Sequence, residues 1–116
     1  MSKRIVFLNT TILTCDGIFS LHTQPLANVR ELLSAVKDER LSAIGHESTA
    51  LILSELLGET IECNRIQYKQ EIGDLAICFK LNGRPPEGKI LTKEEIEAIG
   101  YEFKFLNLVD PATVFE

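Results

Sequence analysis

The chain has 116 residues, of which 45% are hydrophobic and 25% charged, and its formal net charge at pH 7 is −5. This length suits one compact domain, residues 1–116, and excludes two. The acidic balance argues against a protein that coats duplex DNA, because binding to the phosphate backbone usually requires an excess of lysine and arginine. A nucleic-acid ligand of this chain should therefore be small, or should bind in a locally basic pocket.

The sequence gives no indication of a membrane segment or a metal site. Its apolar runs, such as ALIL at residues 50–53, are much shorter than the roughly 20 residues of a membrane span. The first residues pass from charge directly into a strand pattern, which is unlike a signal peptide, so we expect a protein that works inside a cell. Cys15, Cys63 and Cys78 lack the spacing of a zinc site, and we expect no metal and no cofactor. An intramolecular disulfide stays open, although a cytosolic compartment disfavours it.

The first half of the chain predicts strands and helices in alternation. KRIVFLN (3–9) has the β-branched and aromatic content of a buried strand. Asp16-Gly17 marks a turn, which a short strand can follow. Residues 25–39 begin with proline and place apolar side chains at helical spacing. LSAIG (41–45) is predicted to be a short strand or an extended link.

A second helix is predicted at about residues 47–57, with Gly58 as its terminator. Apolar residues occupy most of its sides: Ala50, Leu51, Ile52, Leu53, Leu56 and Leu57. A helix that is apolar nearly all round is buried on more than one face. In so small a protein, the additional face is expected to contact a second subunit.

The second half of the chain predicts a hairpin, a helix and a last strand. Residues 62–81 read as two antiparallel strands joined by IGD, with Arg65, Gln67 and Lys69 on one face of the first strand. Thr92 and Glu95 have the spacing of a capping box, and Gly100 ends that helix. YEFKFLNLV forms the last strand. The fold class is therefore α/β, with a mixed sheet of about five strands and about three helices in a single domain.

The start of the second helix is a candidate anion site. Gly45 permits a close turn, and His46, Ser48 and Thr49 lie at the first helical turn, where free backbone N–H groups and the positive end of the helix attract phosphate. Imidazole exchanges a proton near neutral pH, so a histidine beside a phosphate can protonate a leaving oxygen. The alternative is that these side chains merely cap the helix.

The segment NGRPPEGK is a second candidate. Two prolines follow Arg84 and hold the loop stiff, which lowers the entropy lost when Arg84, Glu87 and Lys89 bind a ligand. The guanidinium of arginine suits a phosphate. The alternative is a rigid surface loop whose charges are only solvated.

Taken together, the segments LNTTIL, AIGHESTALILSELLG, NRIQYK, RPPEGKILTKEEI and IGYEFKFLNLV resemble a family of small proteins of archaeal viruses, the type III anti-CRISPR ring nucleases. The resemblance covers nearly the whole chain, with residues 14–40 as its weakest part. It implies a homodimer in the host cytoplasm that binds cyclic tetra-adenylate and cuts it without a metal. The products implied are linear adenylates with 2′,3′-cyclic phosphate ends.

The resemblance also implies roles for individual residues. His46 matches the catalytic histidine that follows IG, and Arg84 and Glu87 match the arginine and glutamate of the R-x-x-E-G loop. On this basis His46 and Glu87 are the catalytic candidates. The ligand-binding candidates are Asn9, Thr10, Thr11, Gly45, Ser48, Thr49, Arg65, Arg84 and Lys89.

Two other functions remain open at this stage. A viral DNA-binding dimer could use Arg65, Lys69 and Arg84, and members of the family have been proposed to bind DNA. The acidic balance and the absence of a helix rich in arginine, asparagine and glutamine count against it. A structural or protein-interaction module would make His46 incidental.

Overall fold

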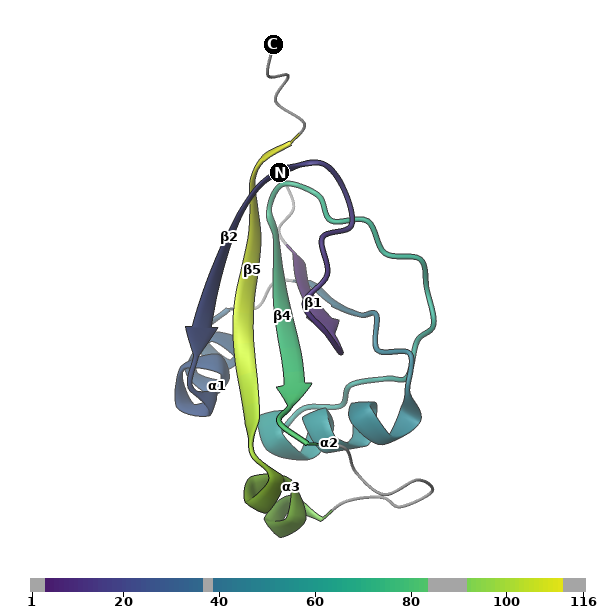
Figure 1. Ribbon diagram of the computed structural model, residues 1–116, viewed down its shortest axis with the longest axis vertical. Helices are drawn as coiled ribbons and strands as arrows, with labels where there is room; N and C mark the ends of the chain where they lie inside the picture. Colours follow the sequence, from purple (N-terminus) through teal and green to yellow (C-terminus); the bar gives the residue numbers. More distant parts are fainter. Residues whose placement is uncertain (1–3, 37–38, 84–91, 112–116) are drawn as a thin grey trace.

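The computed structural model describes residues 4–36, 39–83 and 92–111. In these ranges the chain forms the mixed sheet of five strands and the three helices that the sequence predicts (Figure 1). In chain order the elements are β1 (Arg4–Leu8), β2 (Gly17–Gln24), α1 (Leu26–Ala35), β3 (Glu39–Ser42), α2 (Glu47–Leu57), β4 (Asp74–Leu81), α3 (Lys93–Ile99) and β5 (Tyr101–Pro111). None of these helices is long and apolar enough to span a membrane.

The strands are arranged in the order β2-β5-β4-β1-β3. β1 pairs in parallel with both β3 and β4, whereas β5 is antiparallel to β2 and β4. β5 is therefore the one strand that runs against the other four. Because β1, β3 and β4 are parallel, their carboxyl ends lie at the same edge of the sheet, toward the lower part of Figure 1.

The larger core lies between the helices and one face of the sheet. Alternation along β4 turns Ile77 and Phe79 to this face, where they are buried as predicted. The ring centroids of Phe79 and Phe103 on neighbouring strands are 5.3 Å apart, a distance typical of favourable aromatic pairs. The helices contribute Val29 and Leu33 from α1, Ile96 from α3, and Ala50, Ile52, Leu53, Leu56 and Leu57 from α2.

The opposite face of the sheet, called here the open face, carries no helix. Its buried side chains are Val6, Leu8, Ala76, Cys78 and Leu106. Two irregular segments, residues 9–16 and 62–73, cover part of it. Gln70 anchors the second segment: its side-chain amide donates to the carbonyl of Leu106 (2.9 Å), and its backbone N–H donates to the hydroxyl of Thr14 (2.7 Å).

The predicted hairpin over residues 62–81 is wrong in its first strand. β4 forms as expected, but β1 and β5 occupy both of its edges, so residues 62–70 have no free edge of β4 to pair with. The chain instead runs beside the end of β3, where Cys63 bridges Ile44 in parallel, and then crosses the open face. The alternation of Arg65, Gln67 and Lys69 reflects exposure to solvent, and all three are exposed.

The prediction that α2 needs a partner subunit to bury its second apolar face is also not supported. Its apolar residues are buried within the chain itself, between α1, α3 and the sheet, and only Leu51 of the set remains 48% exposed. Gly58 ends α2 in the left-handed conformation (φ 74°), as predicted.

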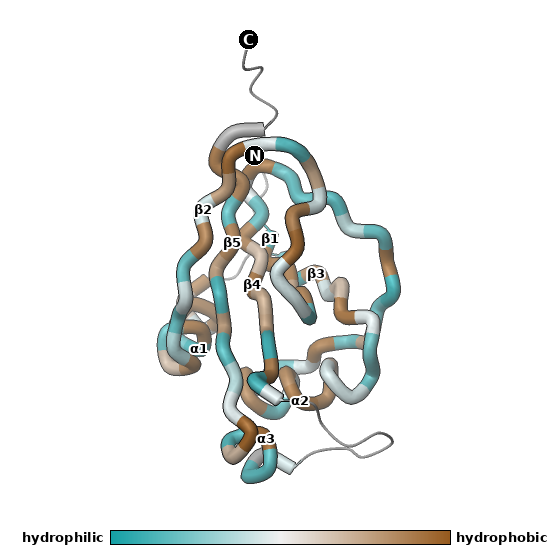
Figure 2. Tube along the Cα trace, viewed as in Figure 1, coloured by the Kyte–Doolittle hydropathy of each residue, from teal (hydrophilic) through white to brown (hydrophobic). Residues whose placement is uncertain are grey.

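Hydropathy along the strands is mixed, and brown and teal residues alternate along β2 in Figure 2.

The ends of the other two helices follow local rules. α3 begins with the predicted capping box, in which Thr92 and Glu95 exchange two hydrogen bonds of 3.2 Å. α1 ends at Ala35 rather than at residue 39. The guanidinium of Arg40 donates to the carbonyls of Leu33 (2.8 Å) and Val36 (2.9 Å), and so satisfies groups that a helix end leaves without an internal partner.

Candidate functional site

Among the described residues, two candidate segments, residues 9–10 and 45–49, follow the adjacent parallel strands β1 and β3. Asn9 and Thr10 follow Leu8 directly. On the β3 side, the N–H of Ala43 donates to the carbonyl of Phe7 (3.0 Å), so that the chain leading to His46 passes beside this end. On the other side β4 ends at Leu81. Ligands of α/β proteins commonly bind at the carboxyl ends of parallel strands.

His46 occupies the N-cap position of α2 in an extended conformation (φ −126°, ψ 126°), and its side chain is exposed. Its imidazole makes no capping hydrogen bond. The alternative that this histidine is present to cap the helix is therefore wrong. Within the described part of the chain, the N–H groups of Glu47, Ser48 and Thr49 receive no side-chain acceptor, which leaves the start of α2 able to bind an anion.

Arg65 lies against the residue that precedes His46. Its Nε donates to the carbonyl of Gly45 at 2.8 Å. This contact depends on the pairing of residues 62–65 beside β3, since the N–H of Asn64 donates to Ile44 (2.7 Å) and its side chain to Ser42 (2.8 Å). Arg65 makes no salt bridge with any described residue, and its guanidinium is exposed. The fold thus places a cation beside the start of α2.

The sequence assigned Gly45 to a close turn before α2, but the backbone at this position does not require a glycine. It does not have a positive φ, so the turn before α2 does not need glycine. A Cβ at this position would lie 3.6 Å from Cγ of Arg65, an ordinary contact. Neither the backbone conformation nor the contact with Arg65 therefore requires a glycine at this position.

The threonines after β1 differ in their surroundings. Thr10 and Thr11 are both exposed, and Asn9 is half-buried. Thr11 lies beside the thiol of Cys78 on the open face. Burial raises the pKa of Cys78 to about 11, against smaller opposing effects of the Thr11 hydroxyl and the Lys104 charge. Of the three predicted ligand-binding residues that follow β1, Asn9 and Thr10 therefore lie nearer to the end of the strand than Thr11 does.

Arg84, Glu87 and Lys89 lie outside the described residues, so their place relative to His46 is not part of this geometry. The chain enters their segment at the carboxyl end of β4, where the N–H of Asn82 donates to the carbonyl of Gly100 (2.9 Å). It leaves the segment at the start of α3. Among the residues described, no group of three or more histidine, cysteine, aspartate or glutamate side chains could hold a metal ion.

Two lysines that the sequence analysis did not consider lie at the same end of the open face. Lys104 is the register partner of Cys78, and Lys80 follows Cys78 by two residues on the same face of β4. Strand alternation already placed Lys80 opposite the core side chains of β4. The position of Lys104 could not be predicted from the sequence, because it depends on the pairing of β5 with β4.

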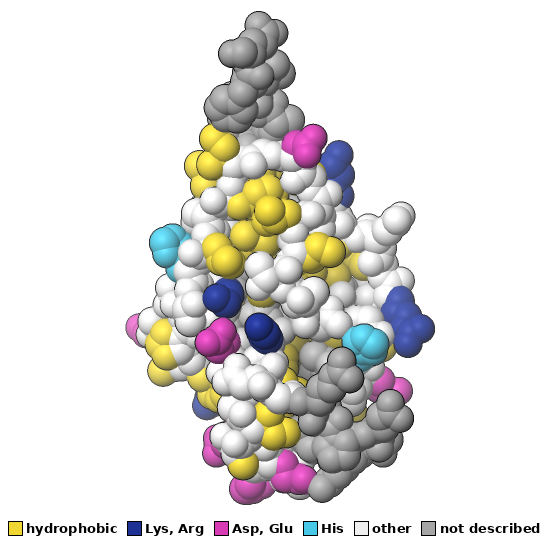
Figure 3. All heavy atoms as spheres, viewed as in Figure 1, with side chains coloured by type: hydrophobic (Ala, Val, Ile, Leu, Met, Phe, Trp, Pro, Cys, Tyr) yellow, Lys and Arg dark blue, Asp and Glu magenta, His cyan; other side chains and the backbone are white. Residues whose placement is uncertain are grey.

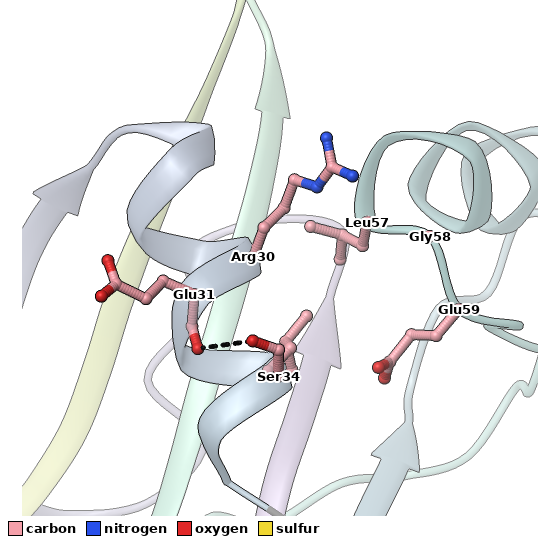
Figure 4. A pocket seen from close by; sticks show the side chains of 7 residues that line it. Arg30, Glu31, Ser34, Leu57, Gly58 and Glu59 are labelled. Carbon is pink, nitrogen blue, oxygen red and sulfur yellow. Dashed lines mark hydrogen bonds between the residues drawn. The ribbon is translucent and has the colours of Figure 1, made fainter.

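A cavity of about 470 Å³ lies elsewhere, between α1 and the end of α2 (Figure 4). Arg30 points toward the end of α2, and Glu31 accepts a hydrogen bond from Ser34 (3.3 Å) through its backbone carbonyl. Gly58 at this cavity and His46 are at opposite ends of α2, roughly 17 Å apart for a helix of this length. None of the residues predicted to bind a ligand lines it.

Comparison with known proteins places this fold in a family. The model of the STIV B116-like family matches residues 5–103. The chain belongs to the STIV B116-like family. Among solved structures, B116 of Sulfolobus turreted icosahedral virus has the same fold, with a TM-score of 0.75 and 22% sequence identity over 91% of this chain and 99% of that one.

Relatives of this STIV B116-like protein occur in viruses and in a bacterium. The uncharacterized protein ORF117 of Acidianus two-tailed virus is 32% identical over 78% of this chain and 79% of its own length. The uncharacterized protein 26 of Sulfolobus islandicus filamentous virus is 36% identical over 78% of both. The uncharacterized protein YddF of Bacillus subtilis is 37% identical over 91% of this chain and 98% of its own length. The relatives are therefore not confined to archaeal viruses.

Proposed function

We propose that this protein is a metal-independent ring nuclease that binds cyclic tetra-adenylate and cleaves it to linear adenylates with 2′,3′-cyclic phosphate ends. It acts as a homodimer in the host cytoplasm and counters type III CRISPR defence. The observation that carries the proposal is the exposed His46 at the uncapped start of α2, with the Arg65 side chain bound to the neighbouring Gly45. The resemblance of the motifs around these residues to the ring nucleases supplies the substrate.

The chemistry needs few groups from the protein. The ribose 2′-oxygen attacks the neighbouring phosphorus, the bond from phosphorus to the 5′-oxygen breaks, and the 2′-hydroxyl proton is released to solvent. His46 donates a proton to the departing 5′-oxygen. Backbone N–H groups at the start of α2 and the Arg65 guanidinium stabilise the charge that develops on the phosphate. Arg84 holds further phosphates, and Glu87 fixes the geometry, either by orienting Arg84 or by accepting a hydrogen bond from a ribose hydroxyl.

The homodimer forms through the open face of the sheet rather than through α2. Leu21 of β2 is 45% exposed on this face, and the crossing segments carry Ile12 (48% exposed), Leu13 (62%) and Ile72 (41%). Figure 3 shows yellow side chains gathered over its upper part, around β2 and the end of β5. An apolar surface of this kind is typical of a protein-protein interface. A two-fold axis through this face brings two copies of His46 to opposite phosphates of one ring.

The decisive experiment incubates labelled cyclic tetra-adenylate with the protein in EDTA and follows the products. We expect His46→Ala to slow cleavage by about 100-fold or more, the range of general acid catalysis, while ring binding is retained. His22→Ala is the matched control, because His22 is also exposed but lies on β2, at the far edge of the sheet from β3. Its rate should equal that of the wild type.

Two results would overturn the proposal. A ring that stays intact with the wild-type protein would favour the DNA-binding dimer, which a salt-dependent shift of duplex DNA would then test. Equal rates for His46→Ala and the wild type would remove His46 from the reaction. Neither α1 nor α2 is rich in the arginine, asparagine and glutamine side chains that read base edges, which counts against either of them as a recognition helix.

A further inference from the structure

Lys80 and Lys104 form a pair of cations on the open face. Lys104 lies in the row of the sheet that contains Cys78 and Leu8, and Lys80 lies in the next row toward the carboxyl end of β4. The two lysines are therefore diagonal neighbours on adjacent strands, about 7 to 8 Å apart. Dark-blue side chains are visible below the apolar patch, over β4 and β5, in Figure 3.

This pair adjoins the candidate site. β1 ends at Leu8, in the row of Lys104, and Asn9 and Thr10 follow at the bend where the chain leaves β1. β3 lies on the other side of β1 and leads into His46. The lysines and His46 thus flank the end of β1 from two sides, with the asparagine and threonine between them.

The charges of the two lysines are not neutralised within the described part of the chain. Its salt bridges use Arg4 and Arg40, and neither Lys80 nor Lys104 takes part in one. Glu102 is the register partner of Lys80 but does not approach it within 4 Å. Like charges at neighbouring sheet positions repel each other, so the arrangement weakens the free protein slightly and favours a bound anion.

We propose that Lys80 and Lys104 bind phosphates of the ring on the open face and are binding residues rather than catalytic ones. The identity of this ligand rests on the proposed function. The pair supplies the locally basic surface that an acidic protein with a net charge of −5 needs for an anionic ligand. Glu102, which shares this surface, weakens the binding.

The test measures ring affinity by fluorescence anisotropy in EDTA, with His46→Ala as the parent so that the ring stays intact. Lys80→Met and Lys104→Met should each weaken binding by about tenfold, the loss of one charged hydrogen bond, and should reduce the salt dependence of the binding constant. Glu102→Gln should tighten binding. Lys69→Met is the matched control, because Lys69 is exposed but lies among Asp16 and Glu71 near the other end of the sheet.

A second readout separates binding from catalysis. With His46 present, the lysine variants should cleave at the wild-type rate when the ring is saturating, and should need more ring to reach it. If the parent binds the ring but the lysine variants match it in affinity and salt dependence, the inference fails while the proposed function stands. If the parent does not bind the ring, both fail.

Discussion

Asp74 is the residue on which the polar contacts of the open face converge. Its carboxylate accepts two hydrogen bonds from the Arg4 guanidinium (2.9 and 2.8 Å), one from the Tyr68 hydroxyl (2.7 Å) and one from the Glu71 backbone (3.1 Å). The side chain is only 3% exposed. These contacts hold the segment 62–73 against the first residue of β4. Asp74 therefore fixes the path of the chain that brings Arg65 to Gly45.

Asp74→Asn should destabilise the protein by about 3 kcal/mol, because it leaves the Arg4 guanidinium without its charged partner. Urea unfolding at pH 7 measures this loss. Glu71→Gln is the control: Glu71 is 73% exposed and 3.5 Å from the Arg4 guanidinium, and exposed ion pairs contribute less than about 1 kcal/mol. Equal losses in the two variants would contradict this account of Asp74.

The same carboxylate predicts a pH dependence of stability. Burial alone would raise the pKa of Asp74, but hydrogen bonds from Arg4, Tyr68 and the Glu71 backbone outweigh it and lower the pKa. The stabilisation is therefore fully present above the unfolded-state value of about 3.9, and it is lost as the pH falls through the lower folded-state pKa. Unfolding free energies measured from pH 5 downward should decrease less steeply for Asp74→Asn than for the wild type.

At the scale of single residues, the sequence identified His46 as a site candidate because of its place before an apolar helix. The sequence alone did not show whether the His46 side chain caps the helix or is free, because both arrangements are compatible with the same residues. That distinction depends on the side-chain conformation at the helix start. The contact of Arg65 with Gly45 could not be predicted from the sequence either, because it joins residues twenty positions apart.

At the scale of elements, α2 was predicted with its observed bounds, Glu47–Leu57. A helix of this kind is specified locally, by apolar spacing along its length and by glycine at its end. The N–H of Gly58 donates to the carbonyl of Ser54 (3.0 Å), and its left-handed backbone lets the chain leave α2 toward the segment that carries Arg65.

Gly58→Ala should destabilise the protein by about 1 kcal/mol. A Cβ at this position would contact nothing within 4 Å, so the effect comes from the left-handed backbone alone. Gly58→Asn is the matched variant, because asparagine tolerates this conformation better, and it should lose less than the alanine variant does. Thermal unfolding of both variants checks the order, and a reversed order would contradict the backbone explanation.

The failure of the predicted hairpin also belongs to this scale. Alternating polar residues in 62–70 fit a strand with one solvated face, and they fit equally well an extended segment that no strand accompanies. Residues 62–70 do not pair with β4 because β1 and β5 already occupy both of its edges. Local sequence contains no information about which edges are already occupied.

At the scale of the whole molecule, the fold bears on where the proposed homodimer would form its interface. α2 buries its apolar residues inside one chain, whereas the open face leaves aliphatic side chains exposed on β2 and on the two crossing segments. The interface proposed above therefore lies on the same face as Lys80 and Lys104. Two copies would enclose the ring between these faces.

Sedimentation velocity can locate the interface. Combining Leu13→Glu with Leu21→Glu should convert a dimer into monomers, because two charges per copy would be buried against apolar side chains. Leu51→Glu is the control on α2, where Leu51 is similarly exposed (48%, against 45% for Leu21), and it should stay dimeric. Dissociation of the Leu51→Glu variant alone would return the interface to α2.

The sequence by itself determined the fold class, the bounds of α2, the strands β1 and β4, and the capping box of α3, because helical spacing, strand alternation and capping are set by residues close together in the chain. The strand order, the route of residues 62–73 and the contact of Arg65 with Gly45 beside His46 were decided by the tertiary structure. These depend on which strand edges pair and on side chains that meet from distant positions, and no local pattern specifies either.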